Sequence, residues 1–126
     1  NINTSKILVA KYDQKVAYNV INTYIKSNKG FKYTAIFAGN DYIALGAIRA
    51  LNDNKINVPN DVSVIGYDNM ELCEYTTPRI TSVNHLGEEI AKKALIELIN
   101  ILNGKKGGEE KVKLSILERE SVLKIF

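Results

Sequence analysis

The chain has 126 residues, a formal net charge of +3, 45% hydrophobic residues and 25% charged residues. This length allows one domain at most, and the charged fraction is typical of a globular protein, which excludes wholesale disorder. The lysines are scattered rather than gathered in a basic stripe, so this segment is not expected to bind DNA or RNA itself. The single cysteine, Cys73, excludes an internal disulfide and fits a reducing compartment, no metal-ligand cluster is recognisable, and no apolar run is long enough to span a membrane. The chain begins at Asn1 without a methionine, which indicates a fragment or a processed product.

Apolar periodicity predicts strands and helices in alternation along the chain. In chain order we expect a strand at Lys6–Ala10, a helix at Gln14–Asn28, a strand at Ala35–Ala38, a helix at Tyr42–Asn54, a strand at Val62–Tyr67, a short helix and loop at Met70–Thr77, a strand at Ile80–Val83, a helix at Glu88–Asn103, and a strand plus tail over Lys113–Leu117 and Ser121–Ile125. Gly30 and Gly104 are expected to stop the helices that precede them, and Asn40 or Asp41 to cap the second helix. The order is typical of an α/β fold, with a mostly parallel sheet flanked by helices on both faces.

Short polar side chains follow two of the predicted strands where each strand ends. Asn40 and Asp41 close one strand, and Asp68 and Asn69 close the next one. The carboxyl ends of parallel strands meet at one edge of a sheet, which is where open α/β sheets bind ligands. These four residues therefore predict a small-molecule site, with Asn40 and Asp68 suited to hydroxyl, amide or amine groups.

A structural role is an equally good interpretation of the same residues. Asn40 and Asp41 could simply cap a helix, and Asp68 could start a turn. Tyr12 lies at the same expected edge and could stack on a ring or form part of the rim. A lone histidine such as His85 is more often structural than catalytic, although it too falls at this edge.

The sequence gives little support for an enzyme. It contains no G-x-G-x-x-G motif, no phosphate-binding lysine loop, no G-x-S-x-G motif and no spacing typical of a metal site. Asp68 does not stand in the acidic and basic setting that a phosphoacceptor aspartate requires, because Asp13 is alone after the first expected strand. No cofactor is therefore expected.

Four motifs occur in an order and spacing that resembles a known family. They are FAGNDYIALGAIRAL, VPNDVSVIGYDN, TPRITSVNH and LERESV. Together they resemble the effector-binding region of the lactose/purine repressor (LacI-type) family over nearly the whole chain, from about Tyr12 to Val122. The resemblance implies one lobe of a two-lobed, periplasmic-binding-protein-like (type I) fold. Residues 1–85 and about 111–126 would form the C-terminal lobe, and the helix in 86–104 would pack on an N-terminal lobe that this chain lacks.

The resemblance also implies roles for individual residues. Asn40 and Asp68 match positions that hydrogen-bond the effector, Tyr12 matches an aromatic residue that packs on the ligand ring, and His85 stands at the crossing between lobes. Asp41 is expected to cap the helix. The implied dimer contacts, on the second helix and the segment after Asp68, are Tyr42, Leu45, Gly46, Arg49, Met70 and Cys73.

The function implied by the resemblance is that of an effector-sensing and dimerisation domain in a cytoplasmic transcriptional regulator, a repressor in type. A sugar or purine-like effector would shift the orientation of the lobes and so bias DNA-binding heads that lie outside this chain. Its partners would be the effector and a second copy of the chain, with DNA bound only through the absent domain and no membrane involved. A periplasmic-type sugar receptor of a transport system is the alternative, and a sugar-processing enzyme is the third possibility.

Overall fold

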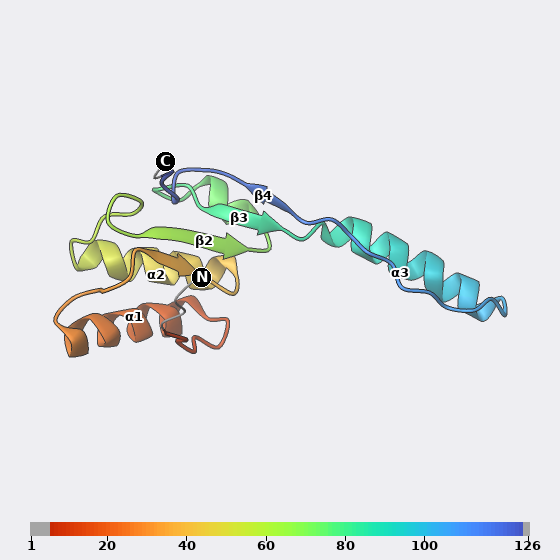
Figure 1. Ribbon diagram of the computed structural model, residues 1–126, viewed down its shortest axis with the longest axis horizontal. Helices are drawn as coiled ribbons and strands as arrows, with labels where there is room; N and C mark the ends of the chain where they lie inside the picture. The colour runs from red at the N-terminus through yellow and green to blue at the C-terminus, as the bar shows by residue number, and fades with distance from the viewer. Residues whose placement is uncertain (1–5, 125–126) are drawn as a thin grey trace.

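The computed structural model describes residues 6–124 and shows an α/β fold (Figure 1). In chain order its elements are α1 (Gln14–Asn28), β1 (Ala35–Phe37), α2 (Asp41–Asp53), β2 (Ser63–Tyr67), the 3-10 helix η1 (Glu71–Glu74), β3 (Thr81–Asn84), α3 (Gly87–Leu102) and β4 (Ser115–Leu117). Each of the helices expected from the apolar periodicity is present within one or two residues of its predicted bounds.

The four strands form one sheet in the order β1-β2-β3-β4. The first three strands are parallel, and β4 returns antiparallel to β3, with Ile116 opposite Val83. Beyond β4 the chain stays near the sheet, because Val64 N donates to Ser121 O at 2.7 Å. The mostly parallel sheet predicted from the alternation is confirmed. The expected strand plus tail is also found, because β4 is Ser115–Leu117 and no strand follows it over the described residues; Ile125 lies outside them.

Local polar contacts fix both ends of α1. Asp13 caps its start, since its Oδ1 accepts a hydrogen bond from Val16 N at 2.7 Å. At its end Lys29 takes a left-handed backbone conformation with φ of 54°, and Gly30 N donates to Ile25 O at 2.9 Å. The predicted stop is therefore at the right place, with Lys29 rather than Gly30 as the first left-handed residue.

The core lies between the sheet and the helices on one of its faces, where α1 packs beside α2. Leu51, Val64 and Ile80 are fully buried there. Gly46 allows α1 and α2 to approach, because a Cβ at this position would lie 2.1 Å from Gln14 O. The small residues of α2 therefore serve contact with α1 inside the same chain.

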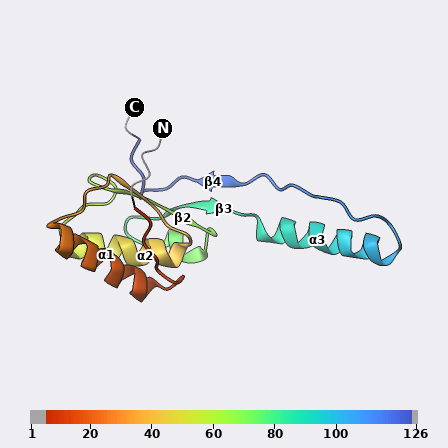
Figure 2. The same ribbon diagram turned by 60° about the horizontal axis from the view of Figure 1, so that its bottom comes forward.

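The opposite face of the sheet has no helical cover in the described part of the chain. Figure 2 shows α1 and α2 on the same side of the strands. The strand register places the side chains of Phe37 and Ile116 on the face of the sheet away from these helices, and they are 68% and 57% exposed. The expectation of a buried β1, with helices on both faces, is thus not met over residues 6–124.

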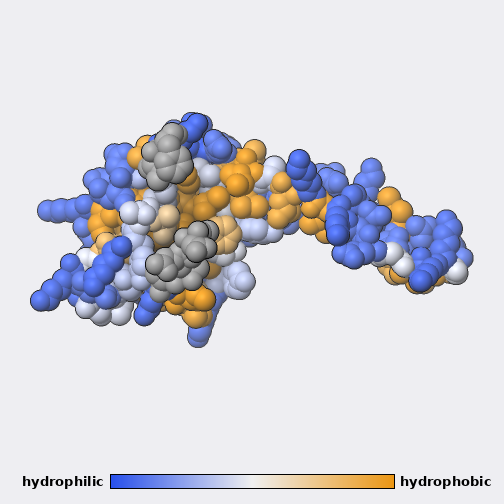
Figure 3. Space-filling model, viewed as in Figure 1, coloured by the Kyte–Doolittle hydropathy of each residue, from blue (hydrophilic) through white to orange (hydrophobic). Residues whose placement is uncertain are grey.

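Helix α3 projects away from the body of the molecule, as Figures 1 and 2 both show. None of its residues is buried, although it carries a run of apolar side chains that includes Leu95 and Leu98. On the face seen in Figure 3, hydrophobic residues gather where the sheet passes into this helix. An amphipathic helix without a partner surface exposes the stripe that helices normally bury.

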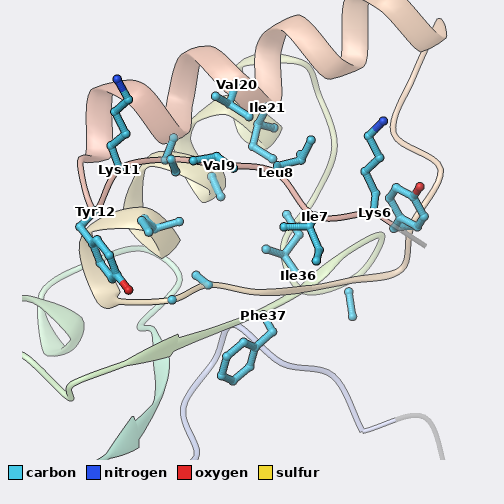
Figure 4. A pocket seen from close by; sticks show the side chains of 18 of the residues that line it. Lys6, Ile7, Leu8, Val9, Lys11, Tyr12, Val20, Ile21, Ile36 and Phe37 are labelled. Atoms are coloured by element: carbon cyan, nitrogen blue, oxygen red, sulfur yellow. The ribbon is translucent and has the colours of Figure 1, made fainter. Parts of the chain in front are cut away.

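The predicted strand at Lys6–Ala10 is wrong. This segment is extended but carries no strand assignment, and Ile7 and Val9 are 90% and 72% exposed. A cavity of about 950 Å³ lies between it and β1, lined also by α1 (Figure 4). A strand needs a neighbour with which to form a hydrogen-bonded ladder, and here the segment and β1 stand apart, so strand-type side chains alone do not make a strand.

Candidate functional site

The carboxyl ends of β2 and β3 bring two predicted site residues together. Asp68 follows β2 and His85 follows β3, and the distance from His85 Nδ1 to Asp68 Oδ1 is 3.7 Å. The imidazole is stacked on the Tyr67 ring, with centroids 6.0 Å apart and an interplanar angle of 19°. Both side chains are about one third exposed, at 37% each, so a solute can reach them.

His85 Nδ1 is buried and has no hydrogen-bond partner among the described residues. Its neighbour Asp68 presents a carboxylate oxygen beyond hydrogen-bonding distance, at 3.7 Å. A ligand hydroxyl can donate to a carboxylate and accept from an imidazole N–H. Because Nδ1 is buried, a hydroxylated molecule can reach the Asp68 carboxylate and the exposed remainder of the imidazole, but not Nδ1 itself.

Tyr12 lies near the end of β1. Its Cε1 is 3.8 Å from the position that a Cβ on Gly39 would occupy, so the ring is beside the residue that precedes Asn40. Its side chain is 73% exposed, and Figure 4 shows it at one end of the cavity beside β1. The aromatic face is therefore free to pack on a ligand ring or to stay at the rim.

Asn40 is the N-cap of α2, because its Oδ1 accepts from Ile43 N at 2.9 Å. The residue is 8% exposed. The capping interpretation is thus confirmed for Asn40 and wrong for Asp41, which is the first residue of the helix itself. Because Oδ1 accepts the hydrogen bond that caps the helix, Asn40 can contact a ligand through its side-chain amide N–H donors.

Asp41 is a buried anchor that the sequence did not reveal. It is fully buried, and its carboxylate accepts from Ser82 Oγ at 2.6 Å and from Met70 N at 2.7 Å. Gly66 of β2 makes room for it, since a Cβ there would lie 2.1 Å from Asp41 Oδ1. Asp41 therefore joins α2, β3 and the start of the η1 segment just beneath the candidate site.

Cys73 of η1 lies in the same buried region. Burial and, after it, the nearby Asp41 carboxylate together raise the pKa of its thiol to about 12. The residue is fully inaccessible. A neutral, enclosed thiol of this kind is a packing residue rather than a nucleophile.

The predicted dimer residues divide into exposed and buried members. Tyr42, Leu45 and Arg49 are partly or fully exposed along one side of α2, and Met70 is half-buried before η1. Gly46 and Cys73 are instead enclosed within the chain, the first against α1. They cannot touch a partner in this conformation, so the dimer surface stays a prediction that rests on the other four residues.

The cavity between Lys6–Ala10 and β1 is a different kind of site. Its lining is dominated by apolar groups, among them Val9, Ile21 and Phe37 (Figure 4). It lacks the convergent polar groups that fix a small polar ligand. The polar edge at Asp68 and His85 is therefore the better candidate for effector binding.

Two further classes of site find no support in the described part of the chain. Over residues 6–124 there is no group of three or more His, Cys, Asp or Glu side chains placed to hold a metal ion. No helix in the same range has the length and apolar character needed to cross a bilayer.

Comparison with known proteins places this architecture in a family. The family model described as "Periplasmic binding protein-like domain" matches residues 3–122. The regulator MalR of Clostridium butyricum is 35% identical over 128 residues, covering 99% of this chain and 37% of the relative. The repressor PurR of Vibrio parahaemolyticus is 38% identical over 104 residues, covering 82% of this chain and 30% of the relative. The chain thus spans about a third of the length of these curated relatives.

Solved structures agree with the sequence relatives. The Escherichia coli transcriptional repressor ascG has a TM-score of 0.78 at 28% identity, over 91% of this chain and 41% of that one. A LacI family regulator from Enterococcus faecium, solved with bound ribose, has a TM-score of 0.78 at 26% identity, over 91% and 42%. The chain belongs to the periplasmic binding protein-like domain family and, within it, to the LacI-type transcriptional regulators.

Proposed function

We propose that this chain is the effector-sensing and dimerisation region of a LacI-type transcriptional repressor, and that its effector is a small sugar or a related polar metabolite. The observation that carries the proposal is the pairing of Asp68 with His85 at the ends of two parallel strands, 3.7 Å apart. Tyr12 and Asn40 stand at the end of β1 on the same edge of the sheet.

These four side chains suit a hydroxylated ring. The Asp68 carboxylate accepts from ligand hydroxyls, and the Asn40 amide and the His85 imidazole add further polar contacts. The Tyr12 ring covers an apolar face of the sugar. Two similar LacI family structures were solved with ribose and with lactose, which supports a sugar here. Because PurR repressors are among the relatives, the test also includes a purine-like ligand.

The chain supplies one wall of a binding site in this proposal. The uncovered apolar stripe of α3 and the unpaired side of β1 are the places where the rest of a longer protein would pack. Effector bound between two lobes would favour one lobe orientation, and the difference in affinity between orientations would bias a DNA-binding domain outside this chain. Two copies would associate through Tyr42, Leu45, Arg49 and Met70, and the protein would act in the cytoplasm.

Calorimetric titration of the complete regulator and of the 126-residue chain with ribose, lactose and hypoxanthine tests the proposal. We expect binding of one of these by the complete protein and binding at least about 100-fold weaker by the chain alone, because half of the contacts are lost. In the complete protein Asp68→Asn should weaken binding by about tenfold, and Glu88→Gln, a matched change on exposed α3, should not. Equal affinity of the chain and the complete protein would contradict the two-lobe arrangement.

A sugar receptor of a transport system shares the fold and remains the second candidate from the sequence. The relatives named above are transcriptional regulators, which favours regulation. The coding sequence upstream of Asn1 decides between them, since a helix-turn-helix segment supports the repressor and a signal peptide supports the receptor. Catalysis has a separate test: Asp68→Asn would abolish turnover of a sugar substrate in an enzyme, whereas we expect it to change binding alone.

A further inference from the structure

Arg119 has a nearly buried guanidinium group that reaches three segments of the chain. Its side chain is 8% exposed, although it belongs to the loop that follows β4. Nη1 donates to Ile80 O at 2.7 Å, Nη2 donates to Asn69 Oδ1 at 2.8 Å, and Nε donates to Glu74 Oε1 at 2.9 Å. Nη2 also contacts Glu74 Oε1.

The position of this guanidinium is fixed from its own backbone. Arg119 N donates to Thr81 Oγ1 at 2.9 Å, and the next two amides, of Glu120 and Ser121, both donate to Arg79 O at 3.0 Å. The planar, forked donor set of arginine then allows few orientations that satisfy all its partners. Arg119 is therefore a rigid point to which other segments are attached.

One of those segments is the turn that carries Asp68. Asp68 and Asn69 both have positive φ, 100° and 54°, so the turn is conformationally unusual for residues with side chains. Asn69 is held at two points: its N–H donates to Ser82 Oγ at 3.0 Å and its Oδ1 accepts from Arg119. These contacts fix the peptide group that follows Asp68, and with it the carboxylate that faces His85.

The other segment is η1. Glu74 lies on this helix, one residue after Cys73, and Met70 of the predicted dimer surface lies just before it. Arg119 thus contacts Asn69, which follows the candidate effector contact Asp68. It also contacts Glu74 of η1, the helix that follows the predicted dimer contact Met70.

We propose that Arg119 is a positioning residue: it orients Asp68 through Asn69 and couples that orientation to η1 through Glu74. This inference rests on the proposed effector site and adds a residue that touches neither effector nor partner. An effector that pulls on Asp68 displaces Asn69, and Arg119 transmits this displacement to the η1 surface.

The first test needs no effector. His85 is the only histidine of the chain, so its ring protons give unambiguous NMR signals from the imidazole next to Asp68. In Arg119→Lys the forked contacts are lost, and we expect the His85 ring signals and the Asp68 amide signal to shift, together with the amide signals of η1. Asn69→Gly should give the same shifts at His85 and Asp68, because glycine accepts the left-handed turn and only the acceptor for Arg119 disappears.

Arg79→Lys is the matched control. Arg79 makes an ion pair with Glu120 at 3.0 Å, and both side chains are half exposed, so its loss should leave His85 and Asp68 unmoved. If Arg119→Lys and Asn69→Gly give His85 and Asp68 signals that coincide with those of Arg79→Lys, the positioning role is overturned. If Arg119→Lys does not fold, Asn69→Gly decides the outcome alone.

The second test measures ribose and lactose affinity in the complete protein. We expect Arg119→Lys to weaken binding by about tenfold and Arg79→Lys to leave it unchanged. Unchanged affinity in Arg119→Lys, beside wild-type binding, contradicts the coupling. If the wild type binds none of the probes, the proposed sugar specificity fails, while the NMR comparison still decides whether Arg119 positions Asp68.

Discussion

The buried carboxylate of Asp41 provides the most direct test of how the site is held. Asp41→Asn keeps the size of the side chain and removes its charge. One oxygen can still accept from Met70 N, which leaves the new amide NH₂ group facing Ser82 Oγ. That hydroxyl already accepts from Asn69 N, so its own proton loses the acceptor that it now has.

The expected cost follows from these contacts. The loss of one charge-assisted hydrogen bond costs about 2 kcal/mol, and an unpaired buried hydroxyl adds about 1 kcal/mol. A destabilisation of about 3 kcal/mol in a domain of this size lowers the melting temperature by about 10 °C. Because the anchor joins α2 to β3 and to the segment before η1, the same variant should also speed alkylation of Cys73 under native conditions.

Thermal melts followed by circular dichroism and urea titrations measure the loss, with Asp53→Asn as the control. Asp53 lies at the other end of α2, where its exposed carboxylate pairs with Arg49 at 3.0 Å. Loss of this surface pair should shift the melt much less than the change at Asp41. If the two variants melt at the same temperature, the carboxylate of Asp41 is not an anchor and this account of the site is wrong.

Three further predictions concern the core, a helix contact and the exposed helix. The raised pKa of Cys73, about 12, means that the folded state keeps the thiol neutral while the unfolded state ionises it near its ordinary pKa of about 8.5. The contribution of this thiol to the free energy of unfolding is therefore complete below about pH 8.5 and is lost towards pH 12, by at most about 1.4 kcal/mol per pH unit. Urea titrations at pH 8 and 10 should show a lower free energy of unfolding at pH 10, and Cys73→Ala should make this difference smaller. Gly46→Ala inserts a methyl group against the backbone of α1 and should lower the free energy of unfolding by about 1–3 kcal/mol in urea titrations. Gly108→Ala, where the nearest atom to the new methyl group would be 3.7 Å away, should leave the free energy of unfolding nearly unchanged. Equal urea midpoints for the two variants would contradict the close packing of α1 on α2. Leu95 and Leu98 of α3 are 58% and 52% exposed, and replacing both by lysine should reduce concentration-dependent association of the chain in sedimentation velocity. Unchanged association would show that the chain associates through another surface.

Local patterns were enough to predict most elements of this fold. The spacing of apolar residues defines Gln14–Asn28 and the helix after Asn40, and short apolar runs define β2 and β3. The carboxyl edge then follows from the topology, which is why Asp68 and His85 could be placed together before their distance was known. Their roles as effector contacts remain predictions.

The errors arise where structure depends on partners distant in the chain. Lys6–Ala10 has the side chains of a strand, but a strand exists only beside another strand, and the segment has none within reach. Asp41 and Arg119 were missed as anchors because their partners lie far away in sequence: Ser82 is 41 residues from Asp41, and Asn69 is 50 residues from Arg119. Polar side chains of this kind look like surface residues until the fold shows that they are buried.

The projecting helix α3 has a mechanical consequence for the residues at its base. Its first end joins β3 through Leu86, which has a φ of 51° and follows His85, and the segment after its last end runs back to β4, with Lys93 Nζ donating to Lys111 O at 3.1 Å. Sixteen residues of α-helix are about 24 Å long, so a rotation of about 10° at Leu86 moves the far end by about 4 Å. A change of backbone angle at Leu86, next to His85, therefore displaces the far end of α3 much more than its base, and the return segment to β4 has to move with it.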